Sequence, residues 1–281
     1  MSMIPRLGSS MRIIALPLVR PGANVTAKIP VFYSYRIVAP PPINKSVRSD
    51  GFFTRRLPEE GLGKWAAHKA TTTWTNFGMA PEGTIKKRAF VLGERLMDQL
   101  DFEESNLKSI DLSIAPPLEL KDSGKDAQIP LLYPPTVLSG PQSLDHLKAL
   151  VEERIPIHNR GLMLYIFFAI LSAPLKLIPI IPNFPFYFCA WRSWSHWKAK
   201  RAAQYIKGLI HSNRIVPVPL ADLNAVYGNP ISGTKSNDSD VLPRDALDQA
   251  IRTLEMSLEE SKDLLRAHEQ VLLRVKKTKT S

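Results

Sequence analysis

The chain has 281 residues and a net charge of +11, with 24 prolines, 14 glycines and one cysteine. This length allows one or two domains, and a hydrophobic content of 44% excludes a wholly disordered protein. The single Cys189 excludes an internal disulfide and a zinc site built from several cysteines. Zinc-protease, dinucleotide-binding, P-loop and GxSxG signatures are also missing from the sequence, so we expect neither an enzyme nor a bound cofactor or metal.

Basic residues are concentrated at the N-terminus. Residues 1–49 contain seven Lys or Arg and no Asp or Glu, which accounts for most of the net charge of +11. The rest of the chain is nearly balanced, so we expect no nucleic-acid partner. An acid-free segment with arginines, serines and hydrophobic residues is typical of a mitochondrial targeting segment. The alternative is a disordered basic tail.

The next hundred residues are predicted to be a linker followed by helices. Residues 50–63 are rich in Pro, Gly and charge, as expected of a linker. Residues 64–100 then show apolar spacings of three and four, interrupted at Gly78 and Pro81. Prolines make residues 115–135 an extended connector, and an amphipathic helix is predicted at 143–154, ended by Pro156. Residues 64–160 are therefore expected to form a helical region on the matrix side.

Residues 161–190 are the most hydrophobic part of the chain, with Lys176 as their only charged side chain. Thirty helical residues would rise about 45 Å, which exceeds the roughly 30 Å of a bilayer core. Four prolines divide the stretch into two halves. We favour a proline-kinked membrane hairpin, because basic residues flank both ends and a hairpin places both flanks on one side. A single kinked span and a buried helix pair in a soluble protein are the alternatives.

An aromatic and basic segment follows directly. Trp191, Trp194 and Trp197 interleave with Arg192 and Lys198. Such a pattern can bind single-stranded nucleic acid, but next to a hydrophobic stretch it is more typical of the membrane interface. We therefore predict that residues 191–227 form an interfacial helix and that the lipid bilayer is a partner.

The C-terminal part is predicted to be an association element. Residues 228–242 form a flexible linker, and residues 243–279 carry leucines at heptad spacing, as in a coiled coil. This amphipathic helix is expected either to bind a protein partner or a second copy, or to pack back on the chain's own helices. The sequence thus predicts a mainly α membrane protein with amphipathic flanking helices.

Three segments resemble a known family. They are KATTTW at Lys69–Trp74, the LKSI run at Leu107–Ile110, and LSAPLKLIPIIPNFPFYFCAWRSWSHWKA at Leu171–Ala199. Together they resemble the mitochondrial K⁺/H⁺ exchange-related proteins of fungi and other eukaryotes. The resemblance implies an inner-membrane protein linked to exchange of potassium ions and protons, and it implies no catalytic residues.

Exchange needs a group that binds a cation and a proton in turn, usually a carboxylate at membrane depth. Residues 161–190 contain none, so we expect a subunit or regulator and not a stand-alone exchanger. Candidate ion-path residues are Lys176, which more simply snorkels from a loop, and Asn183, which more simply forms a turn. His158 and His196 are candidate sensors of matrix pH, with interfacial packing as the simpler role. The alternative function is a membrane-anchored scaffold for matrix machinery such as ribosomes or complex-assembly factors.

Overall fold

The computed structural model describes residues 11–20, 29–38, 72–98, 100–118, 128–174, 184–228 and 241–280. The chain divides into a smaller unit, residues 40–100, and a larger unit formed by residues 1–39 and 101–281. The smaller unit contains a helix at residues 72–78 and α2 (Ile85–Asp98). Trp74 joins these two helices, because its ring lies 5.1 Å from that of Phe90 and its indole nitrogen donates to Glu94.

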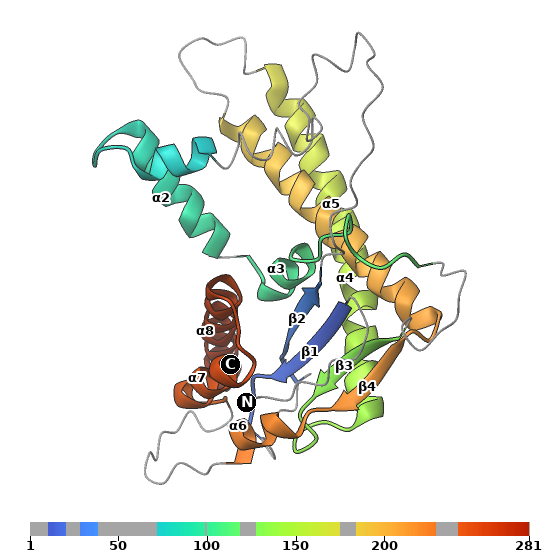
Figure 1. The fold of residues 1–281 in the computed structure, drawn as a ribbon. Helices are drawn as coiled ribbons and strands as arrows, with labels where there is room; N and C mark the ends of the chain where they lie inside the picture. Colours follow the sequence, from blue (N-terminus) through green and yellow to red (C-terminus); the bar gives the residue numbers. More distant parts are fainter. Residues whose placement is uncertain are drawn as a thin grey trace, which may run out of the picture. The chain divides into compact units, whose positions relative to one another are not determined.

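A four-stranded sheet lies at the centre of the larger unit, in the order β2-β1-β3-β4 (Figure 1). Its strands are β1 (Met11–Pro17), β2 (Val31–Ile37), β3 (Ile129–Tyr133) and β4 (Ile215–Pro219). Strand β1 is antiparallel to β2 and parallel to β3, and β3 is parallel to β4. The protein is mostly helical, as predicted, but the sequence analysis missed this sheet, and the predicted fold class is corrected accordingly.

Both faces of the sheet are covered by helices, which explains why its strands were not recognised. Along β1, Ile13 and Ala15 enter one hydrophobic core, whereas Ile14 and Leu16 enter the other. A strand buried on both faces reads as a continuous apolar run and lacks the alternation of a half-exposed strand. Strands β1 and β2 lie within residues 1–49, so the predicted targeting segment, which stays a prediction, overlaps the folded core.

Helices α4 (Gly140–Ser172) and α5 (Phe184–His211) connect β3 to β4 as an antiparallel hairpin (Figure 1). Their sheet-proximal halves bury residues such as Leu147, Val151 and Ala203 against one face of the sheet. Helix α4 begins at a capping box, in which Ser139 and Gln142 satisfy each other's backbone N–H groups. These two helices run side by side, as expected both for the predicted membrane hairpin and for the alternative of a helix pair in a soluble protein.

Pro156 does not end a helix, which corrects the predicted boundary: α4 continues through it to Ser172. A proline removes one hydrogen bond from the helix interior. Packing on both sides of Pro156 holds α4 together, because Val151 is buried on the sheet before it and His158 is buried against α5 after it.

The far end of the hairpin is apolar and exposed. Seven large hydrophobic side chains of α4 between residues 163 and 171 are 40–69% exposed, and Tyr187 on α5 is exposed beside them. By length and composition α4 qualifies as a candidate membrane-spanning helix. The seven α4 residues are Met163, Leu164, Ile166, Phe167, Phe168, Ile170 and Leu171.

The opposite face of the sheet is covered by the C-terminal part of the chain. After α5, residues 191–227 do not continue as one interfacial helix but form β4, the 3-10 helix η4 (Ala221–Leu223) and α6 (Asn224–Gly228). Pro217 and Pro219 favour the extended strand over a helix. The predicted helix therefore extends only to His211, and its position at a membrane interface stays a prediction.

The predicted C-terminal helix is two helices, α7 (Arg244–Thr253) and α8 (Leu258–Thr280). They pack on the chain itself, burying Leu247 and Leu254 near the break and Leu264 and Val271 along α8. Leu265 and Leu272, two of the leucines at heptad spacing, are only partly buried, one residue beyond the buried Leu264 and Val271. The structure therefore has the packed-back arrangement, and association through residues 243–279 stays a prediction.

Candidate functional site

Six polar residues meet where the hairpin leaves the sheet, and we call them the polar cluster. Helix α3 (Phe102–Lys108) supplies two of them, α4 one and α5 three. All except Lys108 are at most 8% exposed. Because a buried polar group is costly unless it is paired, such a cluster is an informative feature of the fold. Its members are Glu104, Lys108, His158, Arg192, Ser195 and His196.

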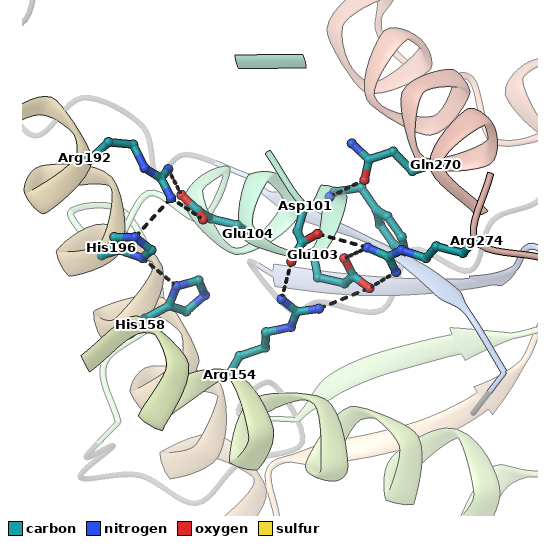
Figure 2. Close-up of polar contacts among 10 residues, drawn as sticks. Asp101, Glu103, Glu104, Arg154, His158, Arg192, His196, Gln270 and Arg274 are labelled. Atoms are coloured by element: carbon teal, nitrogen blue, oxygen red, sulfur yellow. Dashed lines mark hydrogen bonds and ion pairs between the residues drawn. The ribbon is translucent and has the colours of Figure 1, made fainter. Parts of the chain in front are cut away.

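Glu104 is the anion of the polar cluster. Arg192 donates two hydrogen bonds to its carboxylate, at 2.8 and 3.4 Å, and the Ser195 hydroxyl donates a third at 2.7 Å (Figure 2). Lys108, one turn further along α3, lies 3.7 Å from the same carboxylate and donates to Ser195. The cluster therefore links α3 to α5 through charge-assisted hydrogen bonds.

His158 and His196 face each other across α4 and α5. Their Nδ1 atoms are 3.1 Å apart, and Arg192 lies 3.0 Å from the other ring nitrogen of His196 (Figure 2). Gly161 makes this approach possible: a Cβ added there would lie 2.6 Å from the His196 ring. The tight fit of the hairpin at this point thus requires a residue without a side chain.

The protonation states follow from burial and charge. Burial lowers the pKa of His158 to about 4, although Glu104 acts in the opposite direction. Burial and the Arg192 charge also lower the pKa of His196. Burial alone would raise the pKa of Glu104, but the bonds from Arg192 and Ser195 lower it to about 2. At neutral pH the cluster therefore holds an ionised carboxylate and two neutral imidazoles, and the pH-sensing role of the histidines stays a prediction.

A second ionic network begins on the same short helix. Asp101 and Glu103 both bind Arg154 of α4, at 2.8 and 3.3 Å (Figure 2). They also bind Arg274 of α8, at 3.1 and 2.8 Å. Gln270 of α8 accepts a hydrogen bond from the first N–H of α3, at Phe102. Helix α3 and Asp101 therefore tie the base of the hairpin to the C-terminal helix.

The other predicted site residues are distributed as follows. Lys176 and Asn183 lie outside the described residues. Trp194 is exposed and stacks on Trp197 at 4.8 Å, and the guanidinium of Arg201 lies 5.0 Å above the Trp197 ring. The exposed indole and the cation nearby fit the predicted interfacial role.

Trp191 and Lys198 also remain partly accessible on α5. Arg192, predicted at the interface with them, lies in the buried polar cluster instead. The reason is its position on α5, which directs it toward the carboxylate of Glu104 on α3.

Sequence reasoning selected the two histidines but missed their partners. Glu104 lies on a helix of seven residues, too short for a periodic signal. Two signals were present nonetheless. Glu104 and Lys108 have the i,i+4 spacing of a helical ion pair, and Lys108 and Ser195 belong to two separate segments that carry the family resemblance. The structure brings these two segments into contact.

Most of the chain is similar to a known protein family. The model of a family described as mitochondrial K⁺–H⁺ exchange-related matches residues 12–210, which include the hairpin and the whole polar cluster. An uncharacterized protein of Saccharomyces cerevisiae, YDL183C, is 25% identical over 171 residues, 54% of this chain. The chain spans about half of that yeast protein, 53% of its length. No solved structure matches the chain.

Proposed function

The chain belongs to the mitochondrial K⁺–H⁺ exchange-related family, and from this membership we propose that it contributes to potassium/proton exchange and matrix cation homeostasis. The family description itself points to a mitochondrial protein related to K⁺–H⁺ exchange. The proposal goes further in three respects: an inner-membrane location, a body on the matrix side, and a role as subunit or regulator of an exchange system whose transported species are K⁺ and H⁺.

The exposed apolar end of the hairpin carries the proposal. Soluble proteins rarely expose a continuous patch of large hydrophobic side chains, and such patches mark membrane or protein contacts. From Gly161 to its end at Ser172, α4 rises about 18 Å, which is less than the roughly 30 Å of a bilayer core. Since both helices return to adjacent strands of one sheet, the hairpin is suited to enter the bilayer from the side of the body.

The composition of the hairpin supports an auxiliary role over a stand-alone exchanger. An ion path needs polar groups at membrane depth. In the described part of the apolar end, residues 161–174 and 184–190, there is no carboxylate. The buried carboxylates near the base of the hairpin are paired with arginines, Glu104 with Arg192 and Glu103 with Arg154. We therefore propose that the lipid bilayer and at least one further protein of the exchange system are its partners.

Swelling of isolated mitochondria in potassium acetate tests the function. Mitochondria without the protein should swell more slowly, and nigericin, which exchanges K⁺ for H⁺ by itself, should restore swelling. Normal swelling combined with impaired translation or complex assembly would favour the scaffold alternative and refute the proposal.

Lysine substitutions test the membrane contact that the proposal needs. Phe167→Lys and Ile170→Lys place charges on the exposed apolar end, and each is expected to cost about 2.5–3.5 kcal/mol at membrane depth. We expect both variants to be released by alkaline carbonate and to fail to restore swelling. The matched control is Leu273→Lys, an equally exposed apolar residue on α8, which should remain bound and active.

A further inference from the structure

Three side chains of the polar cluster have the composition of a metal site. Glu104, His158 and His196 come from α3, α4 and α5, and one potential ligand atom of each lies within 4.8 Å of the others. All three are buried. Two imidazoles and one carboxylate are a donor set typical of Zn²⁺ and of other divalent first-row metals.

The hydrogen-bond directions leave one ring nitrogen unused. A guanidinium only donates, so the nitrogen of His196 that faces Arg192 must accept, and the Nδ1 of His196 carries the proton. That proton points at Nδ1 of His158, which therefore accepts. The proton of His158 is then on Nε2, which is buried and has no hydrogen-bond partner among the described residues. That N–H offers no lone pair, so a metal ion that binds His158 must displace either this proton or the contact with His196.

We propose that Glu104, His158 and His196 bind a divalent first-row transition metal ion, with Zn²⁺ as the representative, and that the guanidinium of Arg192 takes the place of the ion in the metal-free protein. The site is independent of the role in exchange.

Displacement of the Arg192 side chain explains how a metal ion can enter the polar cluster, which already holds a positive charge. Its guanidinium contacts two of the three ligands, Glu104 at 2.8 Å and His196 at 3.0 Å. A metal ion cannot share these contacts with it, so binding must displace the guanidinium. The rings of Tyr165 and Trp191, 5.4 and 5.7 Å from the guanidinium, offer it a cation–π position beside the cluster.

Metal binding would change how the hairpin is anchored. In the metal-free protein Glu104 is tied to α5 through Arg192 and Ser195. An ion ligated by all three residues would join α3 directly to both helices of the hairpin. Lys108, 3.7 Å from Glu104, stays near the ion and limits its affinity.

Cobalt titration of the purified full-length protein in detergent, without a histidine tag, tests the site. Co²⁺ bound by imidazole and carboxylate gives visible absorption bands, and Zn²⁺ should displace it with a stoichiometry of one. We expect H158Q and H196Q to weaken binding at least tenfold. The control H211Q, at the end of α5 and outside the cluster, should leave it unchanged.

Arg192→Leu separates a metal site from a merely structural cluster. It removes the competing cation and leaves Glu104 without its main partner, so the variant should bind Zn²⁺ more tightly than the wild type. The midpoint temperature of its thermal unfolding should also rise more on Zn²⁺ addition than that of the wild type. Wild-type protein that shows no cobalt bands at millimolar Co²⁺ overturns the proposal even if R192L does not fold. Bands that persist in the double variant H158Q/H196Q overturn it as well.

Discussion

At the scale of single residues, the contact between Gly161 and His196 is the tightest feature of the hairpin. A Cβ at residue 161 would lie 2.6 Å from the imidazole, closer than van der Waals contact allows. The ring cannot move freely, because Arg192 and His158 hold it on two sides. The packing of α4 on α5 therefore depends on one missing methyl group.

Gly161→Ala should destabilise the fold even though alanine favours helices. We expect a loss of about 1–3 kcal/mol, because overpacking a constrained site outweighs the gain of about 1 kcal/mol in helix propensity. Chemical denaturation followed by circular dichroism measures it. Gly228→Ala is the control, since a Cβ there meets open space. Equal stability of the two variants would contradict the proposed tight fit.

The Glu104–Arg192 pair makes a second prediction at this scale. Removing one partner of a buried ion pair costs about 3–5 kcal/mol, because the other charge stays buried and unpaired. Glu104→Gln and Arg192→Gln should each approach this loss, and the double variant should lose much less than their sum. The ion pair of half-buried Lys87 with exposed Glu82 provides the control, where Glu82→Gln should change stability by less than about 1 kcal/mol. Additive losses at the buried pair would show that the two residues act separately.

At the scale of elements, α8 is fastened to the sheet by Glu260. With Ser257 it forms the capping box at the start of α8, and its carboxylate accepts hydrogen bonds from Ser34 and Arg36 of β2. Arg36 also donates to the carbonyl of Leu254, in the break between α7 and α8. One side chain thus sets both the start of the helix and its place on the sheet.

The same contacts make stability depend on pH. Burial would raise the pKa of Glu260, but bonds from Ser257, Ser34 and Arg36 lower it in the folded protein. Since the unfolded chain has the higher pKa, the stabilisation is complete above about pH 4.3 and is lost as the pH falls through the lower, folded value. Glu260→Gln should lower the free energy of unfolding by about 1–2 kcal/mol at pH 7. It should also reduce the loss of this free energy as the pH falls into the acid range. The exposed neighbour Glu259→Gln should leave the free energy of unfolding at pH 7 nearly unchanged.

At the scale of the whole molecule, β1 connects distant parts of the chain. It lies between β2 and β3, and its side chains enter both hydrophobic cores. A chain that begins at Leu18 lacks this strand and should neither unfold cooperatively nor resist proteases. A chain that begins at Met11 retains the whole sheet and is the matched control. In mitochondria we expect the mature N-terminus at or before Met11, as mass spectrometry of the isolated protein can determine.

The sequence predicted the helices better than the sheet or the site, for physical reasons. The three/four spacing reveals amphipathic helices, but β1 reads MRIIALP inside an acid-free segment and resembles a targeting sequence. Strand β3 contains Pro130, which favoured the predicted connector over a strand, and β4 lies within residues 191–227, which were predicted as a helix. The polar cluster joins residues far apart in the chain, from Glu104 to His196, and such a meeting is set by tertiary structure alone.

The pairing of β3 with β4 has a consequence for the order of folding. Ile129 pairs with Ile215, and the whole hairpin of α4 and α5 lies between them in the sequence. Strand β4 therefore cannot pair with β3 until the hydrophobic helices α4 and α5 have left the synthesis or import machinery and are shielded from water. Folding is then slow by topology, because a long loop must close before its strands gain any contact. During that interval strand β3, which already pairs with β1 on its other side, presents an open edge, and this makes the nascent protein a natural client for chaperones.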